Sequence, residues 1–473
     1  MKKQQYTKYY VSALIIACIL VLSIVPLLRL DNSFSGTEAY LHLRMAENEG
    51  MFDELSYGGR FALYSLGLPS ILSLNPDLLG YVLPLVLGVL SFLLFLGLLK
   101  EFNIETKSLA AIILILSPSF LGLFTTLNKL IIPIFLTLFG FYLIFRKSRL
   151  HLLAIPVFAI MPFFNIVISL MSLFLAFLLV NFKLKNKRWL FYILLPITII
   201  TTSLFLGYIF KNTTFERLMF EIGKSGINGK LQDIFSEMGG RYGLSIFASI
   251  LAIFGMINNW KNKYKELFIF FSVFSLIILM MFRIEAIILL NFFIAVFAAK
   301  GFKAFLNARW ESKNLRFFIL LTFICGIVFA SMAQGSRIVN SLPNEAINDA
   351  LKFLDNLPDG TVFSHYSRGF WISYAGKSNV MDDNFMFAPN VNERWKDSQE
   401  LFYTRDWKIA KGIIDKYNIK YVWIDNYLQE EIWEGDDEGL LFLLEYSNSL
   451  KKIYDNKDVY IEQAVQIWKV QEE

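Results

Sequence analysis

Charged residues and cysteines are scarce in this chain of 473 residues. Asp, Glu, Lys and Arg make up 18% of it, against about a quarter in an ordinary soluble domain. The two cysteines, Cys18 and Cys325, each lie inside a long apolar stretch, which argues against a disulfide framework or a cysteine-based zinc site. The three histidines show no spacing typical of a metal-binding pair. The composition therefore excludes disulfide-rich and structural-zinc proteins.

Apolar residues, by contrast, are abundant and occur in long blocks. They make up 55% of the chain, the mean hydropathy is +0.49, and 47 residues are Phe. A membrane-spanning helix needs roughly 20 apolar residues, and about eleven blocks are candidates. The sequence therefore predicts a polytopic α-helical membrane protein. The predicted spans are residues 11–30, 77–99, 107–124, 127–145, 149–162, 164–182, 188–210, 243–259, 266–282, 284–300 and 315–334.

Basic residues fall in alternate connections between these blocks, and they predict the orientation. Connections rich in Lys and Arg stay cytoplasmic, which places the N-terminus inside and the C-terminus outside. The polar loops 31–76 and 211–242 then lie outside the membrane domain of residues 1–334, and so does a C-terminal domain at 335–473. We therefore expect an integral plasma-membrane protein whose C-terminal domain is extracytoplasmic. The net charge of +5 does not indicate nucleic-acid binding, because the basic residues lie in these connections.

The C-terminal domain has the alternating pattern of an α/β fold. Helices are predicted at 344–357, 369–375 and 406–417, and strands at 361–365, 379–381 and 420–424. A hairpin of strands 450–454 and 459–463 is predicted around Asn456-Lys457. This order of elements indicates a small, partly parallel sheet.

The first outer loop begins with a stretch, residues 31–50, that is rich in carboxylates. Tyr40, Leu43 and Met45 have helical spacing, which predicts a helix lying along the membrane surface. Glu38, His42 and Arg44 lie in the same stretch. A carboxylate directly after a first membrane helix suits a catalytic site at the outer surface, although an exposed loop with solvated acids explains the same residues.

Three short motifs resemble those of GT-C superfamily glycosyltransferases, most closely the catalytic subunit of oligosaccharyltransferase. Residues 36–44, GTEAYLHLR, resemble the first outer-loop motif, with Glu38 on its acidic position and Arg44 on its arginine. Residues 235–240, FSEMGG, resemble the motif before a later span, with Glu237 on its glutamate. Residues 364–372, SHYSRGFWI, occupy the place of the family's WWDYG segment.

The resemblance implies sugar transfer from a polyprenyl-phosphate-type lipid donor to an extracytoplasmic protein or glycan acceptor. Glu38 would be the general base or a metal ligand, and Glu237 an acceptor-loop residue. Arg283 resembles the family's phosphate-gripping arginine, although an arginine that snorkels to the membrane interface is an equal reading. The remaining candidate substrate contacts are Arg44, His42, Lys129, Tyr366 and Arg368.

Two departures from the family pattern bear on the reaction. His365-Tyr366-Ser367 replaces the Trp-Trp-Asp that binds the hydroxyl of a glycosylation sequon, which argues against sequon-directed transfer. The turn Thr126-Leu127-Asn128-Lys129 lacks the family's second acidic motif. The resemblance implies Mg²⁺ or Mn²⁺, whereas Lys129 would oppose a cation and favours a metal-independent site.

Two other functions compete with this hypothesis. A catalytically inactive paralogue that binds glycans or lipid carriers explains the lost acidic motif equally well. A transporter or flippase would carry ionisable residues near span centres. The clear spans carry their charges at their ends, which argues against transport.

Overall fold

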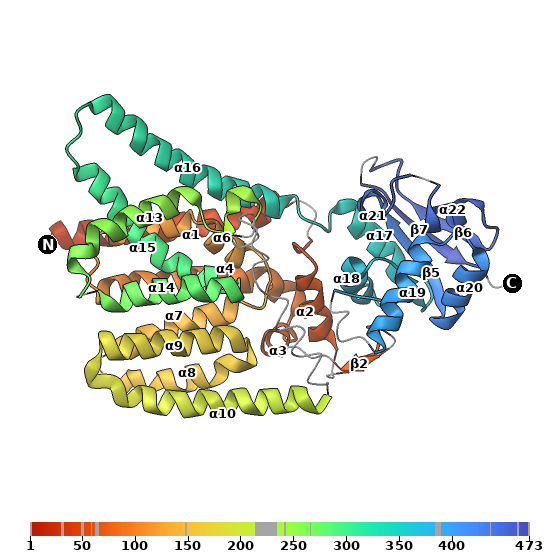
Figure 1. The fold of residues 1–473 in the computed structure, drawn as a ribbon, viewed down its shortest axis with the longest axis horizontal. Helices are drawn as coiled ribbons and strands as arrows, with labels where there is room; N and C mark the ends of the chain where they lie inside the picture. The colour runs from red at the N-terminus through yellow and green to blue at the C-terminus, as the bar shows by residue number, and fades with distance from the viewer. Residues whose placement is uncertain are drawn as a thin grey trace.

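A bundle of apolar helices and a C-terminal α/β domain make up the chain (Figure 1). The computed structural model describes residues 2–29, 33–48, 52–57, 59–61, 66–146, 149–212, 234–240, 243–264, 266–383, 389–435, 437–460 and 463–471. Most of the predicted outer loop 211–242, including three of its glycines, lies outside these residues. The last helix of the bundle leads directly into the C-terminal domain.

Each predicted span corresponds to an apolar helical segment in the bundle. Among the described residues, five helices are long and apolar enough to cross a membrane, or six if a pair bent by 56° is one span. Five further apolar helical segments are shorter, so the count of about eleven spans stays a prediction. The segments are α1 (Lys2–Leu28), α4 (Pro76–Glu101), α5 (Lys107–Ile115) with α6 (Pro118–Thr125), α7 (Ile131–Phe145), α8 (Ala154–Ile160) with its flanking 3₁₀ turns, α9 (Ile166–Phe182), α10 (Arg188–Asn212), α13 (Ile246–Asn259), α14 (Leu267–Phe282), α15 (Ala286–Asn307) and α16 (Lys313–Val339).

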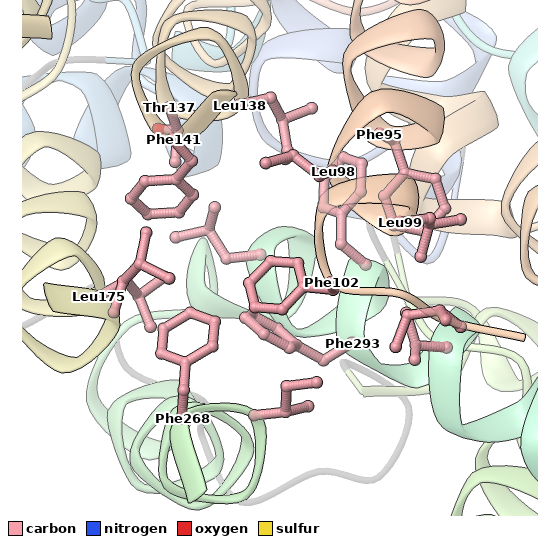
Figure 2. A pocket seen from close by; sticks show the side chains of 16 residues that line it. Phe95, Leu98, Leu99, Phe102, Thr137, Leu138, Phe141, Leu175, Phe268 and Phe293 are labelled. Carbon is pink, nitrogen blue, oxygen red and sulfur yellow. The ribbon is translucent and has the colours of Figure 1, made fainter. Parts of the chain in front are cut away.

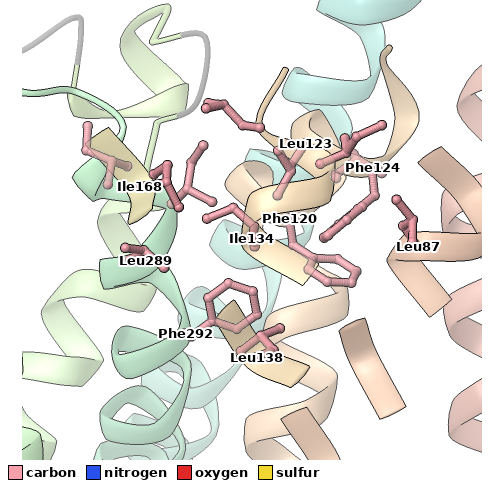
Figure 3. Packing of buried hydrophobic residues seen from close by; sticks show 14 of the residues in the cluster. Leu87, Phe120, Leu123, Phe124, Ile134, Leu138, Ile168, Leu289 and Phe292 are labelled. Carbon is pink, nitrogen blue, oxygen red and sulfur yellow. The ribbon is translucent and has the colours of Figure 1, made fainter. Parts of the chain in front are cut away.

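The bend between α5 and α6 has a local cause. Pro118 has no N–H to donate and breaks the helical ladder, and Ser117 caps the new helix by accepting from the Phe120 N–H at 3.2 Å. The Asn291 side-chain amide donates to the same Ser117 hydroxyl at 2.7 Å. Phe120 and Phe124 of α6 then pack among apolar side chains of the neighbouring helices (Figure 3). The bend thereby fixes where α6 ends and where the turn before α7 begins.

Helices α13 and α15 pack with their backbones close together. A Cβ atom on Gly255 would lie 1.9 Å from the Phe297 carbonyl oxygen, and one on Gly301 would lie 2.0 Å from the Leu251 carbonyl oxygen. Small residues allow such close approach of helix backbones in membranes. Any side chain at either glycine would force these two helices apart.

The C-terminal domain is built on a five-stranded sheet of order β4-β3-β5-β7-β6. Strands β4, β3 and β5 are parallel, and β7 and β6 are antiparallel to their neighbours, so the predicted partly parallel sheet is confirmed. The predicted bounds of the second hairpin strand, residues 459–463, are wrong, because this strand is β7 (Val465–Val470). The turn before it is longer than predicted, and the Asn456 side chain closes it by accepting from the Val465 N–H at 2.6 Å. The elements are α17 (Glu345–Asp355), β3 (Thr361–Phe363), α18 (Gly369–Tyr374), β4 (Ser378–Asn379), α19 (Val391–Tyr403), α20 (Trp407–Lys416), β5 (Ile419–Asp425), α21 (Asn426–Ile432), α22 (Gly439–Tyr446), β6 (Leu450–Asp455) and β7.

The segment between α1 and α4 lies at the junction of the two parts (Figure 1). It forms α2 (Glu38–Glu47), α3 (Gly67–Leu72) and a short hairpin of β1 (Phe52–Asp53) and β2 (Arg60–Phe61). The predicted helix is confirmed as α2, and it lies between the end of the bundle and the C-terminal domain (Figure 1). Tyr40 and Leu43 belong to the main core, whereas Leu41 and Met45 pack on Phe370 of α18. The helix is buried on both sides because bundle and domain enclose it.

Arg29, just after α1, ties the bundle to the C-terminal domain. Its guanidinium donates to the Ile338 carbonyl at 3.0 Å, to the Ser341 hydroxyl at 2.8 Å and to the Pro343 carbonyl. These acceptors lie where α16 ends and the chain enters the domain. A buried guanidinium needs such partners, and here they fix the linker.

Candidate active site

The site is organised around Glu38 in the first turn of α2. Its Oε1 lies 3.3 Å from the Lys129 backbone nitrogen, 4.0 Å from Lys129 Nζ and 3.6 Å from His42 Nε2. The Glu38 side chain is 20% exposed and that of Lys129 is 46% exposed. The carboxylate is therefore held by the fold and still open to a ligand. The structure brings together three residues that the sequence analysis selected separately.

The turn between α6 and α7 presents Lys129. Asn128 is fully buried, and its amide donates to the Leu123 carbonyl at 3.0 Å while its Oδ1 accepts from the Leu130 N–H at 2.9 Å. These bonds use both ends of the Asn128 side chain within the turn. Its neighbour Lys129 is left facing Glu38 with its backbone N–H and its ammonium.

His42 lies one helical turn after Glu38 on α2. Its ring is 2% exposed, and neither ring nitrogen has a hydrogen-bond partner. A buried imidazole without a hydrogen-bond partner costs free energy. The nearest charged atom recorded for it is the Glu38 carboxylate, so a small shift would form a hydrogen bond between the two.

Arg44 faces the hairpin that follows α2. Its Nη2 lies 3.5 Å from Asp53 Oδ1, and Asp53 is 4% exposed. Its Nε is buried without a hydrogen-bond partner. Arg44 therefore links α2 to β1 and retains one unused donor.

Glu237 sits in a different environment from Glu38. Its Oε1 accepts from the Ser245 hydroxyl at 3.1 Å and from the Ile246 N–H at 2.9 Å, at the start of α13. Its Oε2 is buried without a hydrogen-bond partner. Arg337 of α16 holds the segment by donating to the Ser236 carbonyl at 2.5 Å and the Gly240 carbonyl at 2.9 Å. One oxygen of Glu237 thus caps a helix, and the other is available.

Arg283 follows the last turn of α14, and Glu285 precedes α15. Among the described residues Arg283 forms no ion pair, and Glu285 Oε2 is buried without a hydrogen-bond partner. Although Glu285 is only two positions away, no ion pair joins it to Arg283 in the described part of the chain.

Tyr366 and Arg368 lie in the C-terminal domain, between β3 and α18. Arg368 Nε donates to Asp425 Oδ2 at 2.9 Å and its Nη2 donates to Oδ1 at 3.0 Å, both buried. The Arg368 guanidinium also lies 5.1 Å from the Trp371 ring centroid. Tyr366 is half-buried beside His365, with ring centroids 4.0 Å apart, and burial raises the pKa of its hydroxyl. Arg368 is thus engaged within the domain, whereas Tyr366 keeps an accessible edge.

Asp382 carries a contact that sequence reasoning missed. Its carboxylate accepts from the Ser56 hydroxyl at 2.5 Å and from the Tyr57 hydroxyl at 2.8 Å. Asn379 donates its backbone N–H to the Leu55 carbonyl at 3.0 Å, so residues 55–57 run along β4. The acidic stretch at 382 and 383 was visible in the sequence, but its partners lie more than 300 positions away.

The residues around Glu38 do not fit a divalent cation. Mg²⁺ and Mn²⁺ favour several oxygen ligands, and here one carboxylate stands beside an ammonium 4.0 Å away. In the part of the chain that the structure describes, no group of three His, Cys, Asp or Glu side chains comes together. An ammonium at this distance would repel a cation bound to Glu38.

No protein-family model matches the chain, and no curated protein matches it in sequence. Solved structures do match. The apo oligosaccharyltransferase of Archaeoglobus fulgidus covers 89% of this chain and 70% of its own, at 13% identity and a TM-score of 0.59. The match to the same enzyme, AglB, in complex with an inhibitory peptide and a dolichol-phosphate covers 90% of this chain and 70% of the AglB chain, at 13% identity and a TM-score of 0.59.

A third match is the mycobacterial arabinofuranosyltransferase AftD, which covers 98% of this chain and 42% of its own, at 16% identity and a TM-score of 0.56. At these identities the likeness concerns the fold. The chain shares its fold with the archaeal oligosaccharyltransferase and with AftD, and the predicted class of an apolar helix bundle with a C-terminal α/β domain is confirmed to that extent.

Proposed function

We propose that this chain is an integral membrane glycosyltransferase. It takes a sugar from a polyprenyl phosphate or pyrophosphate in the outer leaflet and transfers it to an extracytoplasmic protein or glycan. One observation carries the proposal: a partly exposed carboxylate, Glu38, is held beside the Lys129 ammonium between an apolar helix bundle and a polar domain. The GT-C fold supports it, because the matched structures are sugar transferases.

The proposed reaction is a direct displacement at the anomeric carbon. Glu38 accepts the proton of the acceptor group, whose heteroatom attacks the anomeric carbon as the bond to the donor's phosphate oxygen breaks. The phosphate leaves as an anion, and the Lys129 ammonium stabilises the charge that develops on it. Arg283, with its guanidinium unpaired among the described residues, binds the same phosphate. Inversion at the anomeric carbon follows from a single displacement.

Lys129 supplies the positive charge at this site in place of a divalent cation. Its ammonium lies 4.0 Å from Glu38 Oε1 and is 46% exposed, so it can turn toward a phosphate. The turn that carries it is fixed by Asn128. The proposal therefore requires no metal for transfer.

The acceptor lies toward the C-terminal domain. Tyr366 is the candidate contact there, whereas Arg368 fixes the fold of the segment through Asp425. Glu237 orders the segment before α13 through its bonds to Ser245 and Ile246. In this proposal the C-terminal domain and the acceptor are extracytoplasmic and the N-terminus is cytoplasmic, as the distribution of basic residues predicts.

The test is sugar transfer by the purified full-length chain in liposomes that contain polyprenyl-phosphate-linked sugars. We expect Glu38→Ala to abolish transfer and Glu47→Gln, on the last turn of the same helix, to retain it. Undiminished transfer by Glu38→Ala would disprove the role of Glu38.

A binding protein without turnover is the second candidate. It is favoured by the absence from the turn Thr126-Leu127-Asn128-Lys129 of the second acidic group that the resemblance implies for an active enzyme. The two functions separate in one experiment. If the wild-type chain binds the polyprenyl donor and never releases a transferred sugar with a panel of acceptors, the chain is a carrier-binding protein.

A further inference from the structure

The far end of the bundle holds a polar hollow and an apolar cavity that meet at one turn. This end carries the connections α4–α5, α13–α14 and α15–α16, and it lies away from the C-terminal domain (Figure 1). Neither space belongs to the site at Glu38. We infer that together they bind one membrane phospholipid, with its phosphate in the hollow and an acyl chain in the cavity.

The cavity is suited to an alkyl chain. It has a volume of about 70 Å³ between α4, α7, α9, α14 and α15, and it is partly open, so an alkyl chain can enter it. Figure 2 shows aromatic and aliphatic side chains lining it, among them Phe102, Phe141 and Phe268. The one hydroxyl in the lining, Thr137, is already bonded to the Pro133 carbonyl at 2.7 Å and to Ser172 at 2.6 Å. Such a space offers water no partner, so it is dry or filled by hydrocarbon.

The hollow is suited to a lipid headgroup. Lys300 in its wall is held by Glu266 at 2.5 Å and is 15% exposed, so that pair is internal to the fold. Lys303 is different, because it is 47% exposed and pairs with Glu105, which is 81% exposed. An exposed pair of this kind contributes little stability, so the Lys303 ammonium can exchange its partner for a phosphate. The Thr106 hydroxyl in the same wall is buried without a hydrogen-bond partner and can donate to that phosphate.

The turn between α4 and α5 joins the two spaces. Ile104 lines both of them, while Phe102 lines the cavity and Asn103 lines the hollow. A ligand that fills both must carry a polar head and an alkyl chain next to each other. Phospholipids have this shape and are the solvent of a membrane-embedded bundle.

The charge of this end favours an anionic lipid. The connections here are rich in lysine and arginine, and basic clusters next to membrane helices attract anionic headgroups. The long lipid donor of the proposed reaction reaches Glu38 at the opposite end, so the occupant assigned here is a structural phospholipid. Only this exclusion of the donor rests on the proposed function; the lipid site itself is inferred from the two spaces and their charges.

The test is native mass spectrometry of the full-length chain in detergent, titrated with phosphatidylglycerol. We expect Lys303→Ala to weaken binding about fivefold, as for one basic contact to an anionic headgroup. Lys107→Ala, an exposed lysine on the adjacent helix that lines neither space, is the matched control and should bind as the wild type does. Val296→Phe, which fills the cavity from α15, should abolish tight retention while leaving the thermal midpoint unchanged or higher.

Three results would overturn the assignment. Equal affinities of Lys303→Ala and Lys107→Ala would remove the headgroup site. Full retention of lipid by Val296→Phe would remove the acyl-chain site. Displacement of phosphatidylglycerol by an equal concentration of polyprenyl phosphate would assign the spaces to the donor instead.

Discussion

Glu38 and Glu237 were both selected because they match acidic motifs, yet the structure places them in contrasting regions. Around Glu38 the fold leaves charge available: an exposed ammonium, an unpartnered imidazole and a carboxylate that is still accessible. Around Glu237 the fold uses one carboxylate oxygen to cap α13 and anchors the segment with Arg337. A sequence motif therefore identifies an acidic residue and its position in the chain. The contacts of its carboxylate in the fold determine whether that carboxylate stabilises a helix or stays accessible to a ligand.

Replacing each carboxylate by its amide is the strongest test of this contrast. Glu38→Gln should lower transfer about 10²- to 10⁴-fold, because the amide cannot accept the acceptor's proton. Glu237→Gln should lower it by less than about tenfold, since an amide oxygen still caps the helix. Initial rates in liposomes with a polyprenyl-linked sugar measure both. Equal losses in the two variants would show that the regions do not differ in the way described.

Removing the positive charge of Lys129 should have the next largest effect on the rate of transfer. Lys129→Ala should slow transfer about 10- to 100-fold, as expected for one hydrogen bond between charged groups. Lys129→Asp should in addition create a Mn²⁺ site with Glu38, because a second carboxylate replaces the opposing ammonium. Electron paramagnetic resonance with Mn²⁺ measures binding without reference to activity. Tight Mn²⁺ binding by the wild type would contradict the metal-independent site.

Removing the Glu237 cap should affect stability more than chemistry. Glu237→Ala deletes the acceptor for the Ile246 N–H and should destabilise the start of α13 by about 0.5–2 kcal/mol. A thermal melt of the full-length chain in detergent measures the shift, and Ser245→Ala, which removes the other cap at this helix start, should give a loss of similar size. An unchanged thermal midpoint for Glu237→Ala would show that the Glu237 carboxylate does not stabilise the start of α13 and would leave ligand binding as its role.

The smallest effect concerns His365 in the C-terminal domain. Burial lowers the pKa of its imidazole, so the unfolded chain takes up the proton first as the pH falls. The stability that the neutral ring contributes is complete above about pH 6.5 and decreases as the pH falls from there through the lowered folded value. Thermal melts should show a lower midpoint at pH 5.5 than at pH 7.5, and this decrease should be smaller in His365→Gln than in the wild type. An equal decrease in the variant and the wild type would show that groups other than His365 cause the pH dependence.

The sequence predicted what depends on local pattern. Apolar blocks became helices of the bundle, and the spacing of Tyr40 and Leu43 predicted α2, because periodicity and the helix backbone are properties of neighbouring residues. The burial of α2 could not be predicted from its own residues, because it depends on what covers the helix. The C-terminal domain packs on Leu41 and Met45 through Phe370, a contact that the helical spacing alone does not indicate.

Contacts between distant segments could not be predicted in this way. Glu38 and Lys129 are 91 positions apart, and they were expected to meet only through the resemblance to a family. Asp382 and Ser56 are 326 positions apart, with no local signal in either segment that names the other. The second strand of the hairpin moved to Val465 because the Asn456 side chain, and not the turn residues themselves, determines where pairing begins.

The strand-like docking of residues 55–57 on β4 has a mechanical consequence. The C-terminal domain binds this segment through hydrogen bonds from Ser56 to Asp382 and from the Tyr57 N–H to Asn379. Asp53, two positions before residue 55, lies beside Arg44 of α2. A displacement of the domain is therefore passed along a short chain of polar contacts to the helix that bears Glu38. Under the proposed function, this linkage couples acceptor binding by the C-terminal domain to the position of Glu38.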